Sequence, residues 1–173
     1  VDIPKYAKMT IAATQKLKKF MFYISKSVPV KINFSDMARD LELDRDELPK
    51  YLEYLEKAEL VSVLRMKANG DAILRKMDKL YLHNPNIAYV LSGEKPETGN
   101  ARETIFYCWT KQKYETLESP VSDFEIEGKT FEVGGRKKGK KQIEYVKDGY
   151  LVKDNTEYVF DNQVPLWMFG FLY

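Results

Sequence analysis

Three acidic residues and a run of cations in the second half of the chain have types and spacings that suit phosphodiester chemistry. Asp123 and Glu132 fall on the two predicted strands of one hairpin, and Glu103 falls on a predicted helix before it. Alternation across a short antiparallel pair can bring two carboxylates to one end of a sheet. Their oxygens suit Mg²⁺, which could activate water and stabilise a phosphodiester transition state. The alternative is that these acids are solvated surface residues of a highly charged chain.

The cations follow the second strand of this hairpin directly. Five of the six residues from 136 to 141 are basic: Arg136, Lys137, Lys138, Lys140 and Lys141. The neighbouring glycines let a backbone approach phosphate closely, so one interpretation is a salt-dependent contact with nucleic acid. The other is a solvated loop at a helix start. Because the whole chain carries a net charge of only +2, any nucleic-acid surface must be a local patch.

The elements that must position these residues follow from periodicity and turn chemistry. A helix over 102–113 carries Ile105, Phe106 and Trp109 at helical spacing. The Glu127-Gly128 turn joins strands over 121–126 and 130–133. After the basic run, a short helix is predicted to include Gln142, with strands over 150–153 and 158–160. The apolar tail over 164–173 is predicted to pack into the core.

The first ninety residues are predicted to be mostly helical. Apolar spacing indicates one helix over about 4–26, ended by the Val28-Pro29-Val30 segment. A short helix capped by Ser35 follows, and then one that ends by 56–59, whose cap is either Asp44 or Asp46. Alternation from Val61 and the Asn69-Gly70 turn predict a hairpin that runs to residue 82. This order is that of a winged helix-turn-helix.

The charges of the predicted helix-turn-helix do not favour DNA. The outward positions of its second helix carry three cations and four acids: Arg45, Lys50 and Lys57, and Asp46, Glu47, Glu53 and Glu56. Such a face gives no attractive field for phosphates. We therefore expect it to contact a protein partner at least as readily as nucleic acid.

Composition bounds the remaining possibilities. Residues 92–100 resemble a linker, so we predict an α+β protein with domains over 1–91 and 98–173. One cysteine and one histidine exclude a disulfide framework, a four-cysteine zinc site and a three-histidine metal centre. The sequence contains neither a run of 18 apolar residues nor a signal-peptide pattern after Val1. These features predict a cytoplasmic fragment of a longer protein, with no membrane partner.

Short motifs across nearly the whole chain resemble the C-terminal region of a group of prokaryotic AAA-type ATPases. They are Gly99-Asn100-Ala101-Arg102-Glu103-Thr104, Ser122-Asp123-Phe124, the segment 131–137, Gln142, and the segment 165–171. Proteins of that group have a P-loop ATPase, a winged helix-turn-helix and a C-terminal domain similar to PD-(D/E)XK, or restriction-endonuclease-like, nucleases. The resemblance implies that the second domain is a small mixed α/β domain of this kind. It also implies that ATP is bound only by an ATPase domain outside this sequence, which would be a partner of this one.

The resemblance further implies roles for single residues. Glu103, Asp123 and Glu132 match the superfamily's acids, which would be catalytic and hold Mg²⁺, and Gln142 resembles a glutamine that often follows them. The superfamily's lysine, two residues after the second acid, is replaced by Gly134. Without an ammonium beside the metal, phosphate charge loses a stabilising group. Arg136 or Lys137 could substitute from the loop.

These features lead to two hypotheses about function. The first is a module of an AAA-type ATPase that binds nucleic acid or protein and keeps a degenerate nuclease-like domain as a scaffold; Gly134 favours it. The alternative is a Mg²⁺-dependent DNA nuclease. A cation whose nitrogen lies within hydrogen-bond reach of the space between Asp123 and Glu132 would distinguish the second from the first.

Overall fold

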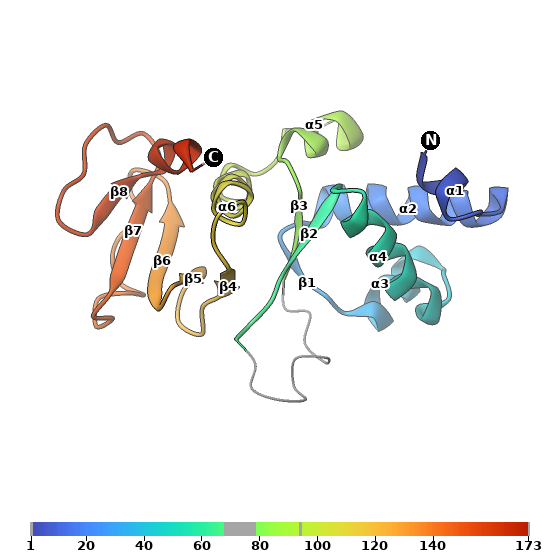
Figure 1. Cartoon of the computed structure of the whole chain (residues 1–173), viewed down its shortest axis with the longest axis horizontal. Coiled ribbons are helices and arrows are strands. Elements are labelled where there is room, and N and C mark those ends of the chain that lie inside the picture. Colours follow the sequence, from blue (N-terminus) through green and yellow to red (C-terminus); the bar gives the residue numbers. More distant parts are fainter. Residues whose placement is uncertain (1, 68–78, 94, 173) are drawn as a thin grey trace. The chain divides into compact units, whose positions relative to one another are not determined.

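The computed structural model describes residues 2–67, 79–93 and 95–172 of the chain. The chain is an α+β protein that divides into two compact units (Figure 1). Unit 1 comprises Val1–Val63 and Leu80–Pro96, and unit 2 comprises Leu64–Lys79 and Glu97–Tyr173. One break therefore falls within the predicted linker, whereas Leu64–Lys79, expected in the first domain, belongs to unit 2. The predicted Asn69-Gly70 turn and residues 73–78 of the predicted strand lie outside the described residues.

Unit 1 begins with two helices where the sequence predicted one. Helix α1 (Asp2–Tyr6) is followed by α2 (Ile11–Ser27). Lys8 takes a left-handed conformation with φ of 50°, and the Thr10 hydroxyl accepts a hydrogen bond from Ala13 N, so a new helix starts after residue 10. The prediction of a continuous helix was wrong because it followed the apolar stripe and not these capping signals.

The next two helices have caps that periodicity does not reveal. Helix α3 (Phe34–Leu41) is capped by Asn33, whose side chain accepts from Ser35 N and Asp36 N, so the prediction of Ser35 as the cap was wrong. Asp44 caps the short 3₁₀ helix η1 (Arg45–Glu47). This leads into α4 (Leu48–Lys57), where Pro49 lies in the first turn and costs no backbone hydrogen bond.

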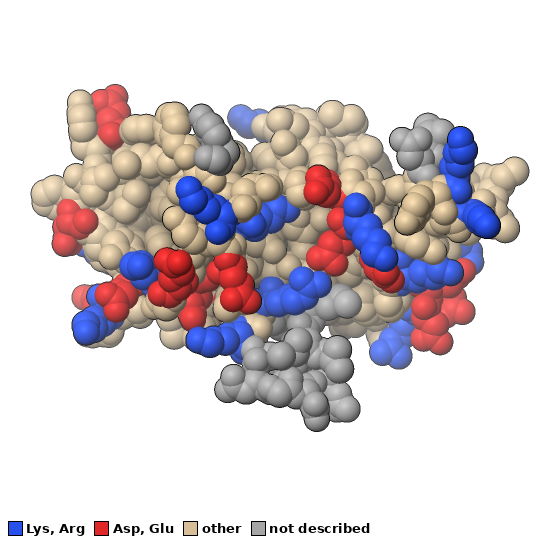
Figure 2. Space-filling view, in the orientation of Figure 1, with Lys and Arg blue, Asp and Glu red and all other residues tan. Residues whose placement is uncertain are grey.

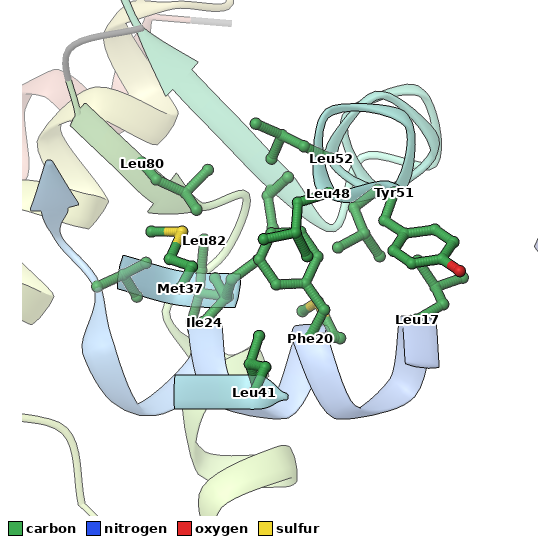
Figure 3. Packing of buried hydrophobic residues seen from close by; sticks show 14 of the residues in the cluster. Leu17, Phe20, Ile24, Met37, Leu41, Leu48, Tyr51, Leu52, Leu80 and Leu82 are labelled. Carbon is green, nitrogen blue, oxygen red and sulfur yellow. The ribbon is translucent and has the colours of Figure 1, made fainter. Parts of the chain in front are cut away.

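A three-stranded sheet and a further helix complete unit 1. The strand order is β1 (Val30–Lys31), β3 (Lys79–Leu82) and β2 (Val61–Leu64). Helix α5 (Asn86–Ser92), which periodicity did not predict, begins where Asn84 accepts from Asn86 N and ends at Gly93 with φ of 67°. Apolar side chains of α2, α3, α4 and β3 meet in one core (Figure 3), with Phe20, Ile24, Leu48 and Leu80 fully buried.

Unit 2 contains one long helix and a mixed five-stranded sheet. Helix α6 (Thr98–Thr110) begins earlier than predicted because the Glu97 carboxylate caps it, 2.8 Å from Asn100 N. The sheet order is β4 (Thr116–Glu118), β5 (Phe124–Ile126), β6 (Lys129–Gly134), β7 (Gly149–Lys153) and β8 (Gln163–Pro165). The first three strands are antiparallel, and the β6–β7 and β7–β8 pairs are parallel.

Aromatic packing joins α6 to this sheet. The Phe106 ring lies 5.0 Å from Phe124, 5.6 Å from Phe131 and 4.7 Å from Phe169, measured between ring centroids. Phe169 lies on the C-terminal 3₁₀ helix η3 (Leu166–Phe171). The prediction that the tail packs into the core holds for Leu166 and Phe169, whereas Trp167, Met168 and Phe171 are exposed.

Three local predictions in unit 2 differ from the structure. The strand expected over 121–126 starts only at Phe124, so Asp123 precedes it. Residues 141–145 form turns instead of a helix. The expected strand over 158–160 is reduced to a single antiparallel bridge between Phe160 and Gln163. Among the described residues, no helix has both the length and the apolar character needed to cross a membrane.

Candidate active site

Glu132 is the most deeply buried of the predicted site residues. It lies on β6, paired in register with Leu151 of β7, and its side chain is completely buried. Two side chains contact its carboxylate: the Lys138 ammonium forms an ion pair with Oε1, and the Ser122 hydroxyl donates to Oε2. A buried carboxylate is stable only with such partners. Lys138 and Ser122 therefore fix the position of the charge of Glu132.

Asp123 lies directly before β5, next to Glu132 across the hairpin. Its Oδ2 accepts a hydrogen bond of 2.8 Å from Val133 N, the amide that follows Glu132. Burial is the main cause that raises the pKa of Asp123 to about 6; the negative charges of Glu103 and Glu132 also raise it, whereas the Val133 N–H and Lys79 lower it. The three predicted acids therefore share one electrostatic environment.

Glu103 approaches this environment from α6. Its Oε2 lies 3.8 Å from the Lys79 ammonium at the start of β3, and both side chains are largely buried. Within the ranges 2–67, 79–93 and 95–172, no three His, Cys, Asp or Glu side chains gather closely enough to form a metal site. The negative charge of Glu103 nevertheless acts on Asp123, since it raises the pKa of that residue more than the charge of Glu132 does.

Lys138 reaches Glu132 through space that a side chain at position 134 would fill. A Cβ atom placed on Gly134 would lie 2.5 Å from Lys138 Cγ and 2.6 Å from Lys138 Cβ. Desolvation lowers the pKa of Lys138, but the hydrogen bond to Glu132 and the charges of the acids outweigh it and raise that pKa overall. Glycine at 134 is therefore what allows the lysine to lie over this strand.

The sequence suggested Arg136 or Lys137 in place of the lysine that Gly134 replaces, whereas the structure places Lys138 beside Glu132. Arg136 and Lys137 are exposed on the turn after β6, whereas Lys138 is only partly exposed. The sequence interpretation assigned Lys138 to nucleic-acid contact alone and was incomplete, because a strand followed by a turn brings the fourth residue after Gly134 back over it. Gln142, expected on a helix, is exposed on a turn.

Two residues at this site had no role assigned from the sequence. Ser122 belongs to the Ser122-Asp123-Phe124 motif, where its position beside Asp123 was the available signal. Lys79 precedes Glu103 by more than twenty residues, and no local pattern could connect them. Such long-range pairs follow only from the fold.

The basic run 136–141 is divided between paired and exposed cations. Lys138 pairs with Glu132, and the Lys140 ammonium lies 2.8 Å from Asp161 Oδ2. Arg136, Lys137 and Lys141 are exposed. On the face of the molecule in Figure 2, Lys and Arg side chains are interspersed with Asp and Glu. A nucleic-acid contact by this run would therefore involve the small group of exposed cations Arg136, Lys137 and Lys141.

Two ion pairs engage charged residues on and beside α4 in unit 1. Lys57 lies 2.6 Å from Glu53, and Glu47 lies 2.6 Å from Lys16 of α2. The hydrogen bond with Glu53 raises the pKa of Lys57 and lowers that of Glu53. These pairs agree with the expectation that α4 has no attractive field for phosphates.

The comparison with protein families gives a match over residues 1–98, to a family described as a domain of unknown function (DUF8612). The chain belongs to this family. No curated protein and no solved structure matches the chain. The matched range contains unit 1 and Lys79, and it ends before Glu103, Asp123, Glu132 and Lys138.

Proposed function

We propose that unit 2 is a Mg²⁺-dependent nuclease that cleaves phosphodiester bonds at Asp123, Glu132 and Lys138. The observation that carries this proposal is the ion pair between Lys138 and the buried Glu132. This ion pair places a cation beside Asp123 and Glu132, where the sequence has Gly134 instead of the lysine expected from the resemblance. This contact favours a nuclease over a scaffold that only binds.

The carboxylates fit Mg²⁺ without a third acidic ligand. Mg²⁺ in proteins keeps several waters and is usually held by one or two carboxylates together with substrate phosphates. Asp123 and Glu132 would hold it, with Glu103 contributing negative charge nearby. The like charges that raise the pKa of Asp123 are those that a bound cation would relieve. When bound, the ion supplies charge stabilisation at phosphate and an acidified water.

The protein groups then have separate tasks. Ser122 holds Glu132 in one orientation, and the Val133 N–H does the same for Asp123. The Lys138 ammonium donates to a phosphate oxygen and stabilises the negative charge that develops there. Asp123 must be ionised to bind a cation, and its pKa is about 6 without metal, so Mg²⁺ should bind more weakly as the pH falls below that value.

The wider resemblance supports a place for this nuclease in a larger protein. We propose that unit 1 is a winged helix-turn-helix, supported by its helices and the β2–β3 pair in the predicted order, to which the structure adds the unpredicted strand β1. Because Glu47, Glu53 and Lys57 are paired within unit 1, its proposed partner is a protein, such as the ATPase domain that the resemblance implies. In this arrangement ATP is bound outside the present sequence.

Cleavage of labelled single- and double-stranded DNA during a Mg²⁺ titration tests the proposal. The wild type should cleave, whereas Glu132→Gln and Lys138→Ala should lose at least about 100-fold in rate. The matched control Lys147→Ala removes an exposed lysine between the basic run and β7 and should cleave normally. A folded wild type that cleaves neither substrate at any Mg²⁺ concentration would contradict the proposal and leave the scaffold hypothesis.

A further inference from the structure

A loop beside the candidate active site carries two exposed aromatic rings. Residues 154–162, which we name the aromatic loop, connect β7 to β8. The loop begins at Asp154, whose N–H donates to Gly134 O at 2.9 Å. Gly134 is the last residue of β6, the strand that bears Glu132. Tyr158 and Phe160 on this loop are 78% and 74% exposed.

Polar contacts hold the aromatic loop along its length. Asp154 Oδ2 accepts from Arg102 Nε at 2.9 Å, and Thr156 O accepts from Trp167 Nε1 at 3.1 Å. Near the other end, Phe160 and Gln163 exchange backbone hydrogen bonds. The two exposed rings are therefore presented from a loop with fixed ends, which lowers the entropy cost of binding a ligand on them.

An ion pair connects the aromatic loop to the basic run. The Lys140 ammonium lies 2.8 Å from Asp161 Oδ2, the residue after Phe160. This pair neutralises Asp161, which follows Phe160 in the chain, while Arg136, Lys137 and Lys141 of the run remain exposed. The loop with the exposed rings thus contacts the run with the exposed cations, and Asp154 joins this loop to Gly134 at the end of β6.

We propose that the aromatic loop and the basic run together bind single-stranded nucleic acid, with unpaired bases stacked on Tyr158 and Phe160 and phosphates on the three cations. Stacking on an aromatic side chain needs a base whose face is free, and a duplex hides these faces inside its stack. The inference rests on the proposed function, because the single-stranded nucleic acid bound here is the substrate that would be cleaved beside Lys138. It adds that the substrate is single-stranded.

Binding without metal separates this inference from cleavage. In EDTA, fluorescence anisotropy would measure the affinity of a labelled oligothymidylate and of a duplex of equal length. Tyr158→Ala/Phe160→Ala should bind the single strand at least about 10-fold more weakly, since it removes both aromatic faces on which bases would stack. Duplex affinity should change less than about twofold. The control Tyr6→Ala removes an 87% exposed ring of unit 1 and should bind both as the wild type does.

A conservative variant keeps the test independent of folding. Phe160→Leu retains an apolar side chain but no aromatic face, so it should lose single-strand affinity while Tyr158→Phe retains it. Tryptophan emission checks the fold, because Trp167 contacts the same loop. Unchanged single-strand affinity in the double variant, or an equal loss for duplex, would overturn the inference, as would recovery of binding in Phe160→Leu. Failure of the proposed nuclease would instead appear as tight binding without cleavage in Mg²⁺.

Discussion

Gly134 and Lys138 share one volume, so the effects of their substitutions should be coupled. Gly134→Ala places a methyl group against the Lys138 stem, at distances of 2.5 to 2.9 Å from three of its carbons. This should displace the ammonium from Glu132 and lower the midpoint of thermal unfolding. In Gly134→Ala/Lys138→Ala the contacts with Lys138 Cγ and Cδ are removed and only the contact with Cβ remains, so the second substitution should cost less than it does alone, by about 0.5–3 kcal/mol.

Thermal unfolding of the four proteins of this cycle measures that coupling. Gly139→Ala is the matched control, because no atom lies within 4 Å of a Cβ placed there. It should show additive behaviour with Lys138→Ala. Additivity at Gly134 as well would mean that Lys138 does not occupy the space above β6.

The raised pKa of Asp123 predicts how stability depends on pH. Between its ordinary value of 3.8 and about 6, the folded protein holds a proton that the unfolded chain has lost, so stability decreases as pH rises. Asp123→Asn keeps an acceptor for Val133 N and does not titrate. It should be more stable than the wild type above pH 6, by about 1–2 kcal/mol after allowing for partial exposure.

Urea unfolding across pH 4 to 8 checks this expectation, and the advantage of Asp123→Asn should disappear below about pH 4. Addition of Mg²⁺ at pH 7.5 should stabilise the wild type more than the variant, because only the charged side chain binds the ion. The exposed Glu144→Gln serves as control and should follow the wild type. An advantage that persists at pH 4 would contradict the electrostatic origin.

At the scale of elements, the sequence predicted the parts of the site that follow local rules. Alternation and the Glu127-Gly128 turn predicted the β5–β6 hairpin and the position of Glu132 on its second strand. The short β4 was missed because three residues give too little pattern, and its Glu118 amide pairs with Arg65 O, far away in sequence. Lys138 and Lys79 could not be assigned for the same reason, since both meet their acids through the fold.

The turns at 141–145 show how local signals can mislead. The apolar residues Ile143 and Val146 suggested a helix, but the structure uses them in successive turns, with Ile143 N bonded to Lys140 O and Val146 N to Ile143 O. A Cβ atom at Gly149 would lie only 3.0 Å from Ile143 Cβ. Close packing of Ile143 on the start of β7 therefore prevails over the helical spacing.

The basic run is an element whose contribution can be measured by salt dependence. Arg136→Ala/Lys137→Ala/Lys141→Ala should reduce the slope of log affinity against log salt by about 2 for single-stranded DNA, at about 0.7 per phosphate contact. Lys138 and Lys140 already pair with acids and should contribute less. Affinity at several salt concentrations provides the slope. Lys5→Ala/Lys8→Ala/Lys18→Ala, three exposed lysines of unit 1, should leave it unchanged.

At the scale of the whole molecule, the two units can be followed by different signals. Both tryptophans, Trp109 and Trp167, belong to unit 2, so tryptophan emission reports its unfolding alone. Phe106→Ala should destabilise unit 2 by about 3–5 kcal/mol and move the fluorescence transition to lower denaturant. Phe20→Ala in unit 1 should move the circular-dichroism transition of the helices and leave the fluorescence transition in place. A common shift of both signals in both variants would show that the units unfold as one.

The division of the chain at Val63, Lys79 and Pro96 also has a consequence for synthesis on the ribosome. All of unit 1 has been synthesised by residue 96, so it can fold while the rest of the chain is still being translated. Unit 2 uses residues made early, because Met66 bridges Glu118 and Lys79 pairs with Glu103. Met66 and Lys79 cannot make these contacts until α6 and the strands of the unit 2 sheet have been synthesised, although unit 1 is by then already complete. Unit 2 is thus completed last, and a chain interrupted after residue 96 would release a folded unit 1 without the acids of the candidate active site.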